Sequence, residues 1–280
     1  MYVEYWGLKR MPFENLNDPS FFYYSSGHKE ALARMNYAVQ QRKLGVLLSG
    51  EYGTGKTFLS RILKKFFIED KYSFIYIPNP RLNSLEFIRE IDFQLGATQS
   101  VSSQPTKIDI LRSIQNTLEA QHRRDKFTVI VIDEAQSIQT EDLLEEVRLL
   151  LNIQSEEAVL FTLILLGQPQ LEEKVERAPQ LKQRLSIRYK LATLSQQEVR
   201  QYIEHRLKVA GTTRKIFTTD AYNAIFSLSK GMPRAINNIC DLALLSAFIK
   251  KANTIDKITV AHVGEDLGEI TQAENKESND

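Results

Sequence analysis

Residues 50–57 read Gly-Glu-Tyr-Gly-Thr-Gly-Lys-Thr, and this stretch decides the fold class. It fits the pattern G-x-x-x-x-G-K-[ST], in which glycines let successive backbone N–H groups turn toward phosphate oxygens. The apolar run Leu44–Gly50 comes before it, and Phe58–Phe67 follows with the spacing of an amphipathic helix. A phosphate-binding loop (P-loop) between a buried strand and a helix is the context that the pattern requires. The stretch therefore predicts an α/β domain that binds a nucleotide.

The chemistry of the loop gives its residues separate roles. The amine of Lys56 is expected to reach the β- and γ-phosphates, and the hydroxyl of Thr57 is expected to bind Mg²⁺. The N-terminus of the following helix adds a partial positive charge. The predicted cofactors are ATP and Mg²⁺. The loop residues predicted to hold the nucleotide are Gly50, Glu51, Tyr52, Gly53, Thr54, Gly55, Lys56, Thr57 and Phe58.

The second half of the site is predicted at the end of the apolar run Phe127–Asp133. Asp133 stands where a carboxylate can join the Mg²⁺ shell, so Thr57 and Asp133 are the predicted metal ligands. Glu134 leaves the strand in a different direction and can take a proton from an attacking water as general base. This pair of acids favours ATP hydrolysis over transfer of a phosphoryl group to a small molecule.

Apolar runs alternate with helical patterns as far as residue 193, which predicts a parallel sheet covered by helices on both faces. After that only helical patterns follow. The predicted strands are Leu44–Gly50, Tyr72–Pro78, Phe127–Asp133, Ala158–Gly167 and Ser186–Leu194. The predicted helices are His28–Arg42, Phe58–Phe67, Leu82–Leu95, Lys107–Arg124, Glu141–Ile153, Ser195–Val209, Thr218–Ser229, Arg234–Lys251 and Thr259–Gly268.

This pattern predicts four segments. Residues 1–43 form an aromatic strap and a first helix, 44–193 the nucleotide-binding core, 194–270 a helical lid, and 271–280 a polar solvated tail. The aromatic side chains between Tyr2 and Tyr37 should pack against other parts of the protein. They are expected to form a hydrophobic strap, a wall of a ligand pocket, or both.

Composition bounds the class of protein. The 280 residues carry a net charge of +1, which excludes nucleic-acid binding by bulk charge but leaves room for a local basic patch. The single cysteine, Cys240, cannot form an internal disulfide, and no secretory signal or membrane-spanning run is visible. The chain is expected to be cytoplasmic.

Several short motifs resemble those of AAA+ ATPases of the ExeA/GspA type, which are associated with general secretion. The resemblance implies the additional-strand class of P-loop ATPases, with a five-stranded parallel sheet in the order 5-1-4-3-2 and a small all-helical lid. The motifs are Tyr5-Trp6-Gly7-Leu8, Pro12-Phe13, Asp18-Pro19-Ser20-Phe21-Phe22-Tyr23, His28-Lys29-Glu30-Ala31-Leu32, the P-loop, Asp133-Glu134-Ala135-Gln136, Leu149-Leu150-Leu151-Asn152, Leu165-Leu166-Gly167-Gln168-Pro169, Leu181-Lys182-Gln183-Arg184 and Gly231-Met232-Pro233-Arg234.

The resemblance also implies polar residues that act on the γ-phosphate. Gln168 resembles the sensor that orients the attacking water, with Asn152 as the weaker candidate. Arg234 resembles the second sensor, which reaches the γ-phosphate from the lid. Arg184 resembles the arginine finger that acts on ATP in a neighbouring subunit, with Arg188 as the alternative.

A trans-acting finger implies a homo-oligomer, either a ring or a filament. The resemblance further implies that Pro12, Phe13 and His28 line the adenine pocket. In that family the AAA+ part often continues into a membrane segment and a periplasmic peptidoglycan-binding domain, and neither is expected within these residues.

Three functions are consistent with these features. The first is an ATP-hydrolysing assembly factor for a secretion or pilus-type envelope machine, peripheral to the inner membrane. The second is an ATP-dependent, DNA-binding transposition regulator of the TnsC, TniB and MuB kind that recruits a transposase. The third is an ATP-gated switch or adaptor with slow turnover, in which ATP binding and not hydrolysis is the signal. Basic residues that could serve DNA binding are Arg61, Lys64, Lys65, Arg123, Arg124, Lys182, Arg184, Arg188 and Lys190.

Overall fold

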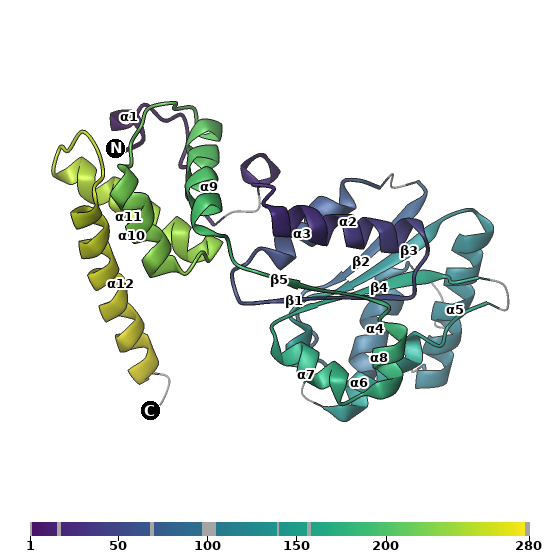
Figure 1. The fold of residues 1–280 in the computed structure, drawn as a ribbon. Coiled ribbons are helices and arrows are strands. Elements are labelled where there is room, and N and C mark those ends of the chain that lie inside the picture. Colours follow the sequence, from purple (N-terminus) through teal and green to yellow (C-terminus); the bar gives the residue numbers. More distant parts are fainter. Residues whose placement is uncertain are drawn as a thin grey trace. The chain divides into compact units, whose positions relative to one another are not determined.

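The computed structural model describes residues 2–15, 18–67, 70–96, 105–138, 140–155 and 158–277, and the side chains of these residues except 141 and 269–277 (Figure 1). It divides into two compact units. The sheet unit is His28–Leu191, and the helical unit combines Met1–Gly27 with Ala192–Asp280. From the sequence, boundaries are expected after residues 43 and 193. The structure splits the first predicted segment, because its helix packs with the sheet unit while the preceding residues pack with the helical unit.

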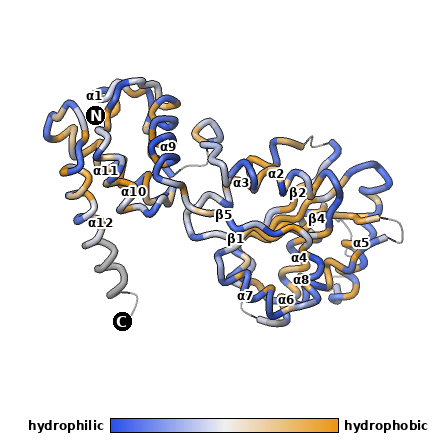
Figure 2. The backbone as a smooth tube through the Cα atoms, in the orientation of Figure 1, coloured by the Kyte–Doolittle hydropathy of each residue, from blue (hydrophilic) through white to orange (hydrophobic). Residues whose placement is uncertain are grey.

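The sheet unit is built on five parallel strands in the order β2-β3-β4-β1-β5 (Figure 1). This confirms the predicted fold class and strand order. The three central strands are buried along their whole length, and they are drawn as a largely hydrophobic block in Figure 2. The edge strands are partly exposed, against the expectation of two apolar faces throughout, because an edge strand has a neighbour on only one side. The strands are β1 (Gly45–Gly50), β2 (Tyr72–Ile77), β3 (Phe127–Ile132), β4 (Phe161–Gly167) and β5 (Ile187–Leu191).

Helices cover both faces of this sheet (Figure 1). α2 (Ser26–Gln40) and α3 (Lys56–Lys64) lie over one face. The other face carries α4 (Ser84–Gln94), α5 (Lys107–Arg123), α6 (Glu141–Leu150), α7 (Gln170–Glu176) and α8 (Pro179–Arg184). Buried side chains of these five helices form one cluster with Leu47, Ile130 and Leu163 of the sheet. The short helices α7 and α8 are absent from the sequence prediction, since two turns or fewer show little periodicity.

The helical unit contains α1 (Tyr2–Tyr5), the 3₁₀ turn η1 (Pro19–Phe21), α9 (Gln196–Val209), α10 (Thr219–Ser229), α11 (Pro233–Ile249) and α12 (Lys257–Glu277). A capping box starts α9, since the Ser195 and Glu198 side chains cap each other's backbone N–H groups. Cys240 of α11 is buried in the apolar core of the helical unit. α12 continues past its predicted end at Gly268 and into the predicted tail, of which residues 278–280 lie outside the described part.

The N-terminal aromatic segment packs into the core of the helical unit, as expected for a hydrophobic strap. Trp6 is 0% exposed, and its indole Nε1 donates a hydrogen bond of 3.1 Å to the carbonyl of Leu244. The guanidinium of Arg206, itself 5% exposed, donates to the backbone carbonyls of Pro12 at 2.5 Å and Glu14 at 2.8 Å. These contacts tie the start of the chain to α9 and α11.

Among the helices that the structure describes, none combines the length and the apolar content needed to span a bilayer.

Candidate nucleotide-binding site

The P-loop follows the end of β1 and requires its glycines for two reasons. Gly53 and Gly55 have φ values of 83° and 100°, a left-handed region that side-chain-bearing residues rarely adopt. Gly50 is needed for space, because a Cβ there would lie 2.7 Å from the carbonyl oxygen of Leu191. The loop therefore curls tightly before α3 begins at Lys56. Its backbone N–H groups and the start of the helix form a cradle of the kind that binds phosphate.

Lys56 is held inside this loop. It is 5% exposed, and its Nζ donates hydrogen bonds to the carbonyls of Gly50 at 2.7 Å and Glu51 at 2.9 Å. Burial lowers the pKa of the Lys56 amine, while the nearby carboxylates of Glu134, Asp133 and Glu51 oppose that shift. A phosphate bound in the cradle would offer the same amine stronger, charged acceptors.

Asp133 lies directly after β3, is 2% exposed, and accepts hydrogen bonds at both of its carboxylate oxygens. Oδ2 accepts from the Thr57 hydroxyl at 2.5 Å and from the Tyr76 hydroxyl at 2.7 Å. Oδ1 accepts from the backbone N–H of Glu134 at 2.9 Å. Burial and the Asp133 carboxylate raise the pKa of the Tyr76 hydroxyl, so Tyr76 stays protonated and acts as a donor.

The oxygens of Thr57 and Asp133 fit a Mg²⁺ ion. Hydroxyl and carboxylate oxygens are the ligands that Mg²⁺ prefers, and in nucleotide sites it takes only one or two protein ligands beside phosphates and water. In the part of the chain that the structure describes, no group of three or more His, Cys, Asp or Glu side chains could hold a metal. The two oxygens of Thr57 and Asp133 are consistent with a Mg²⁺ site in which the phosphates of the nucleotide supply further ligands.

Glu134 follows Asp133 directly and begins a turn. Its φ is 52°, in the left-handed region, and it is the N-cap of the 3₁₀ turn η2 (Ala135–Ser137). Its Oε2 accepts a hydrogen bond of 2.5 Å from the amide nitrogen of Gln136. The amide oxygen of Gln136 in turn accepts from the backbone N–H of Gln168 at 3.0 Å. The predicted base and the predicted sensor are therefore joined through one intervening side chain.

His28, predicted to line the adenine pocket, contacts the P-loop. Its Nε2 lies 2.9 Å from the carbonyl of Thr54, and because a carbonyl only accepts, that nitrogen is the donor. A Cβ at Gly55 would lie 3.1 Å from the same nitrogen. His28 thus braces the P-loop backbone, and its role toward adenine stays a prediction.

Two predicted residues lie away from the P-loop of their own chain. Asn152 follows α6 in the connection to the start of β4, and Arg184 ends α8 just before β5. Because all five strands are parallel, the amino-terminal ends of β4 and β5 lie at the end of the sheet opposite the P-loop. The guanidinium of Arg184 donates to the carbonyl of Leu151 at 3.1 Å. The alternative finger, Arg188, pairs with Glu176 at 3.0 Å.

The remaining predicted residues belong to the helical unit. Phe13 is 2% exposed in its core, with its ring edge-to-face against Phe217. Arg234 is exposed in the first turn of α11, which begins at Pro233. Gly231 before it could not carry a side chain, because a Cβ would lie 2.0 Å from the carbonyl oxygen of Leu194. The roles of Pro12, Phe13 and Arg234 toward nucleotide stay predictions.

Two residues at the site have no assigned role in the sequence analysis. Tyr76 comes from β2, the strand beside β3, and Gln136 stands inside the Asp133-Glu134-Ala135-Gln136 motif. Tyr76 could have been found as a polar side chain near the end of β2, the strand that pairs with β3. That inference requires the strand order.

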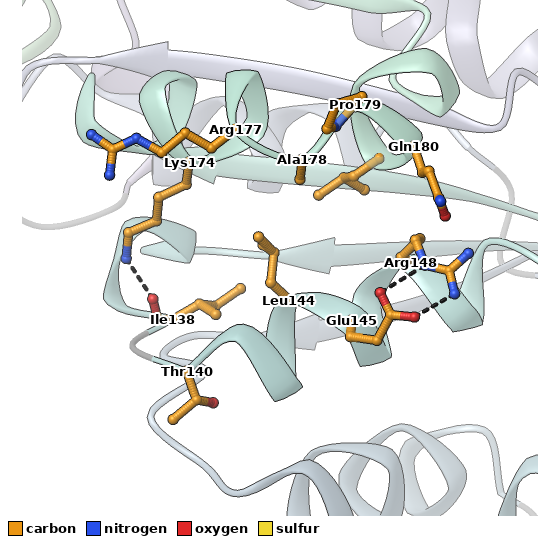
Figure 3. A pocket seen from close by; sticks show the side chains of 11 residues that line it. Ile138, Thr140, Leu144, Glu145, Arg148, Lys174, Arg177, Ala178, Pro179 and Gln180 are labelled. Carbon is orange, nitrogen blue, oxygen red and sulfur yellow. Dashed lines mark hydrogen bonds and ion pairs between the residues drawn. The ribbon is translucent and has the colours of Figure 1, made fainter.

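A separate cavity of about 570 Å³ lies between η2–α6 and α7–α8 (Figure 3). Its wall includes the apolar side chains of Leu144, Ala178 and Leu181 and the charged pair Glu145–Arg148. No P-loop residue lines it. Of the described residues that line it, Ile138 follows the turn that begins at Glu134, and Lys174 donates to the carbonyls of Gln136 and Ile138.

Residues 39–175 match the family described as AAA domain. The structure resembles that of the ORC2 protein of Aeropyrum pernix in ADPNP–ADP complexes, with a TM-score of 0.66 and 19% identity over 92% of this chain and 71% of that one. It also resembles the RuvB Holliday junction branch migration motor of Thermotoga maritima, with a TM-score of 0.57 and 18% identity over 86% of this chain and 68% of that one. The chain is an AAA+ ATPase by fold and by sequence.

A curated relative gives a narrower match. Over 260 residues the chain is 38% identical to general secretion pathway protein A of Aeromonas hydrophila. The match covers 91% of this chain and 46% of that protein, so the chain spans about half of the relative's length. Within the AAA+ ATPases the chain therefore belongs to the ExeA/GspA type.

Proposed function

We propose that this chain hydrolyses ATP to ADP and phosphate with Mg²⁺ held at Thr57 and Asp133. The observation that carries the proposal is the meeting of Lys56, Thr57, Asp133 and Glu134 around the carboxyl ends of β1 and β3. Thr57 and Asp133 would hold the ion, and Mg²⁺ when bound would neutralise negative charge that develops on the phosphates.

The protein's own groups then have distinct tasks. Lys56 exchanges its loop carbonyls for the β- and γ-phosphates. Glu134 takes a proton from the attacking water while the water oxygen bonds to the γ-phosphorus and the bond to the β–γ bridging oxygen breaks. Gln168 orients that water. Arg234 from the helical lid and Arg184 from a neighbouring subunit stabilise the γ-phosphoryl charge, so turnover requires a homo-oligomer.

We further propose that ATP-driven oligomerisation helps to assemble a secretion or pilus-type envelope machine, from the cytoplasmic side of the inner membrane. The supporting observation is the identity to general secretion pathway protein A. A DNA-binding role has less support, because many of the basic residues that could serve it are engaged within the chain. Lys182 and Arg188 pair with Glu176, and Arg123 pairs with Glu119.

The test compares wild type, Glu134→Gln and, as matched control, Glu173→Gln on the exposed side of α7. Glu134→Gln should bind ATP normally and lose turnover by about 100-fold or more, the contribution typical of a general base. The control should match wild type. Turnover by Glu134→Gln at the wild-type rate would remove Glu134 as the base.

The same variants test the role in assembly. Light scattering of Glu134→Gln with ATP should show an oligomer that is absent with ADP or without nucleotide. Addition of duplex DNA at low salt should not change its size. Salt-dependent growth on DNA would instead support the transposition regulator.

A further inference from the structure

We propose that Gln136 is a positioning residue that fixes the position of the Glu134 carboxylate relative to the end of β4. The inference rests on the proposed role of Glu134 as general base. Gln136 uses both ends of its carboxamide. Its Nε2 donates to Glu134 Oε2 at 2.5 Å, and its Oε1 accepts from the Gln168 backbone N–H at 3.0 Å.

This bridge needs the chemistry of a carboxamide. One atom must donate to a carboxylate while another accepts from a backbone N–H. A carboxylate at position 136 could only accept and would add a like charge beside Glu134. An apolar side chain of similar length would offer neither bond.

The surroundings leave room for the bridge. Gly167, the last residue of β4, lies against the Gln136 amide, and a Cβ there would come within 3.0 Å of Gln136 Oε1 and 2.6 Å of Leu171 Cδ2. The absence of a side chain at this strand end therefore allows Gln136 to reach the backbone of Gln168.

The turn itself is held by hydrogen bonds from a side chain of α7 to its backbone carbonyls. The Nζ of Lys174 donates to the carbonyl of Gln136 at 2.5 Å and also to the carbonyl of Ile138, the contact drawn in Figure 3. The Gln136 backbone is thus held by α7 while its side chain spans to Glu134 and to β4. Lys174 supports the turn without touching the Glu134 carboxylate.

The arrangement compensates for an unusual backbone at the base. Glu134 adopts a left-handed conformation at φ 52°, which costs energy for a residue with a side chain and persists only where neighbours fix it. Its side chain starts from a tight turn, so without the Gln136 amide the carboxylate would have other rotamers to occupy. A general base must lie within hydrogen-bond reach of the water it activates, and a displacement of about 1 Å can cost about 100-fold in rate.

The test is a cycle of Gln136→Met and Glu134→Gln in the full chain. Gln136→Met removes both hydrogen bonds at similar length and should lower kcat by about 100-fold while leaving the affinity for ATP unchanged within about twofold. In the Glu134→Gln background the same substitution should have no further effect on single-turnover hydrolysis, because it acts through the base. Gln180→Met, on the exposed surface of α8, is the matched control and should match wild type.

A second variant keeps the test decisive if Gln136→Met does not fold. Gln136→Glu keeps an acceptor for the Gln168 N–H but places a negative charge beside Glu134, and it should also lose kcat with ATP affinity retained. A wild-type kcat for either variant would overturn the inference, as would an equal loss in the Glu134→Gln background. Turnover by Glu134→Gln at the wild-type rate would contradict the proposed role of Glu134 as the base. A wild-type kcat of the Gln136 variants alone would contradict only the role of Gln136, so the two outcomes can be told apart.

Discussion

The hydroxyl of Thr57 donates a hydrogen bond of 2.5 Å to Oδ2 of Asp133, although 76 positions separate the two residues in the chain. Thr57 lies in the first turn of α3, which follows β1, and Asp133 follows β3. The two strands are not neighbours, since β4 lies between them. The contact exists because the carboxyl ends of parallel strands all lie at the same end of the sheet. Side chains that follow β1 and β3 can therefore meet there although β4 lies between the two strands.

Thr57→Val should raise the Mg²⁺ concentration for half-maximal ATP turnover by about tenfold or more, because the valine keeps the shape of the side chain but removes the hydroxyl ligand. Thr57→Ser keeps the hydroxyl and serves as the control, with a Mg²⁺ requirement close to that of wild type. Titration of Mg²⁺ at saturating ATP measures both. An unchanged requirement in Thr57→Val would show that Thr57 does not bind the metal.

Lys56→Ala should weaken ATP binding by at least about 100-fold, because it removes the buried cation whose charge the phosphates would meet. The control is Lys64→Ala, an exposed lysine in the last turn of the same helix. Calorimetry with ATP compares the two variants with wild type. Equal affinity in Lys56→Ala and Lys64→Ala would contradict the assignment of residues 50–57 as the phosphate site.

Arg206→Met should destabilise the helical unit by about 2–4 kcal/mol, because charged hydrogen bonds to two backbone carbonyls and to the Tyr202 hydroxyl are lost together. Lys208→Met, exposed on the same helix, is the control. Trp6, the single tryptophan, is buried in this unit and reports its unfolding in urea by fluorescence. Identical midpoints for the two variants would show that Arg206 does not hold the N-terminal segment.

The sheet and the phosphate loop were predictable from the sequence because each has a local signal. Residues 50–57 specify their own backbone through the positive φ of Gly53 and Gly55, and the long apolar runs specify buried strands. The strand order came from a resemblance to a known family, since periodicity carries no information on which strands pair. Edge strands were less regular because half of their surroundings is solvent.

Contacts between residues distant in sequence could not be predicted in this way. Tyr76 reaches Asp133 only because β2 pairs with β3. Gln136 reaches the backbone of Gln168 only because β4 ends beside the turn after β3. The pairing of Arg206 with the carbonyl of Pro12 links residues 194 positions apart, and no pattern within α9 marks it. Such contacts depend on the tertiary arrangement and have no local counterpart.

The union of the two chain ends in one helical unit has a consequence for biosynthesis. The backbone carbonyl that receives the indole N–H of Trp6 belongs to Leu244, a residue that the ribosome adds 238 positions later. The sheet unit, by contrast, is one continuous stretch, His28–Leu191, and can close as soon as that stretch has emerged. During synthesis, the aromatic side chains before Gly27 therefore cannot reach their final packing partners until the residues after Ala192 have been added.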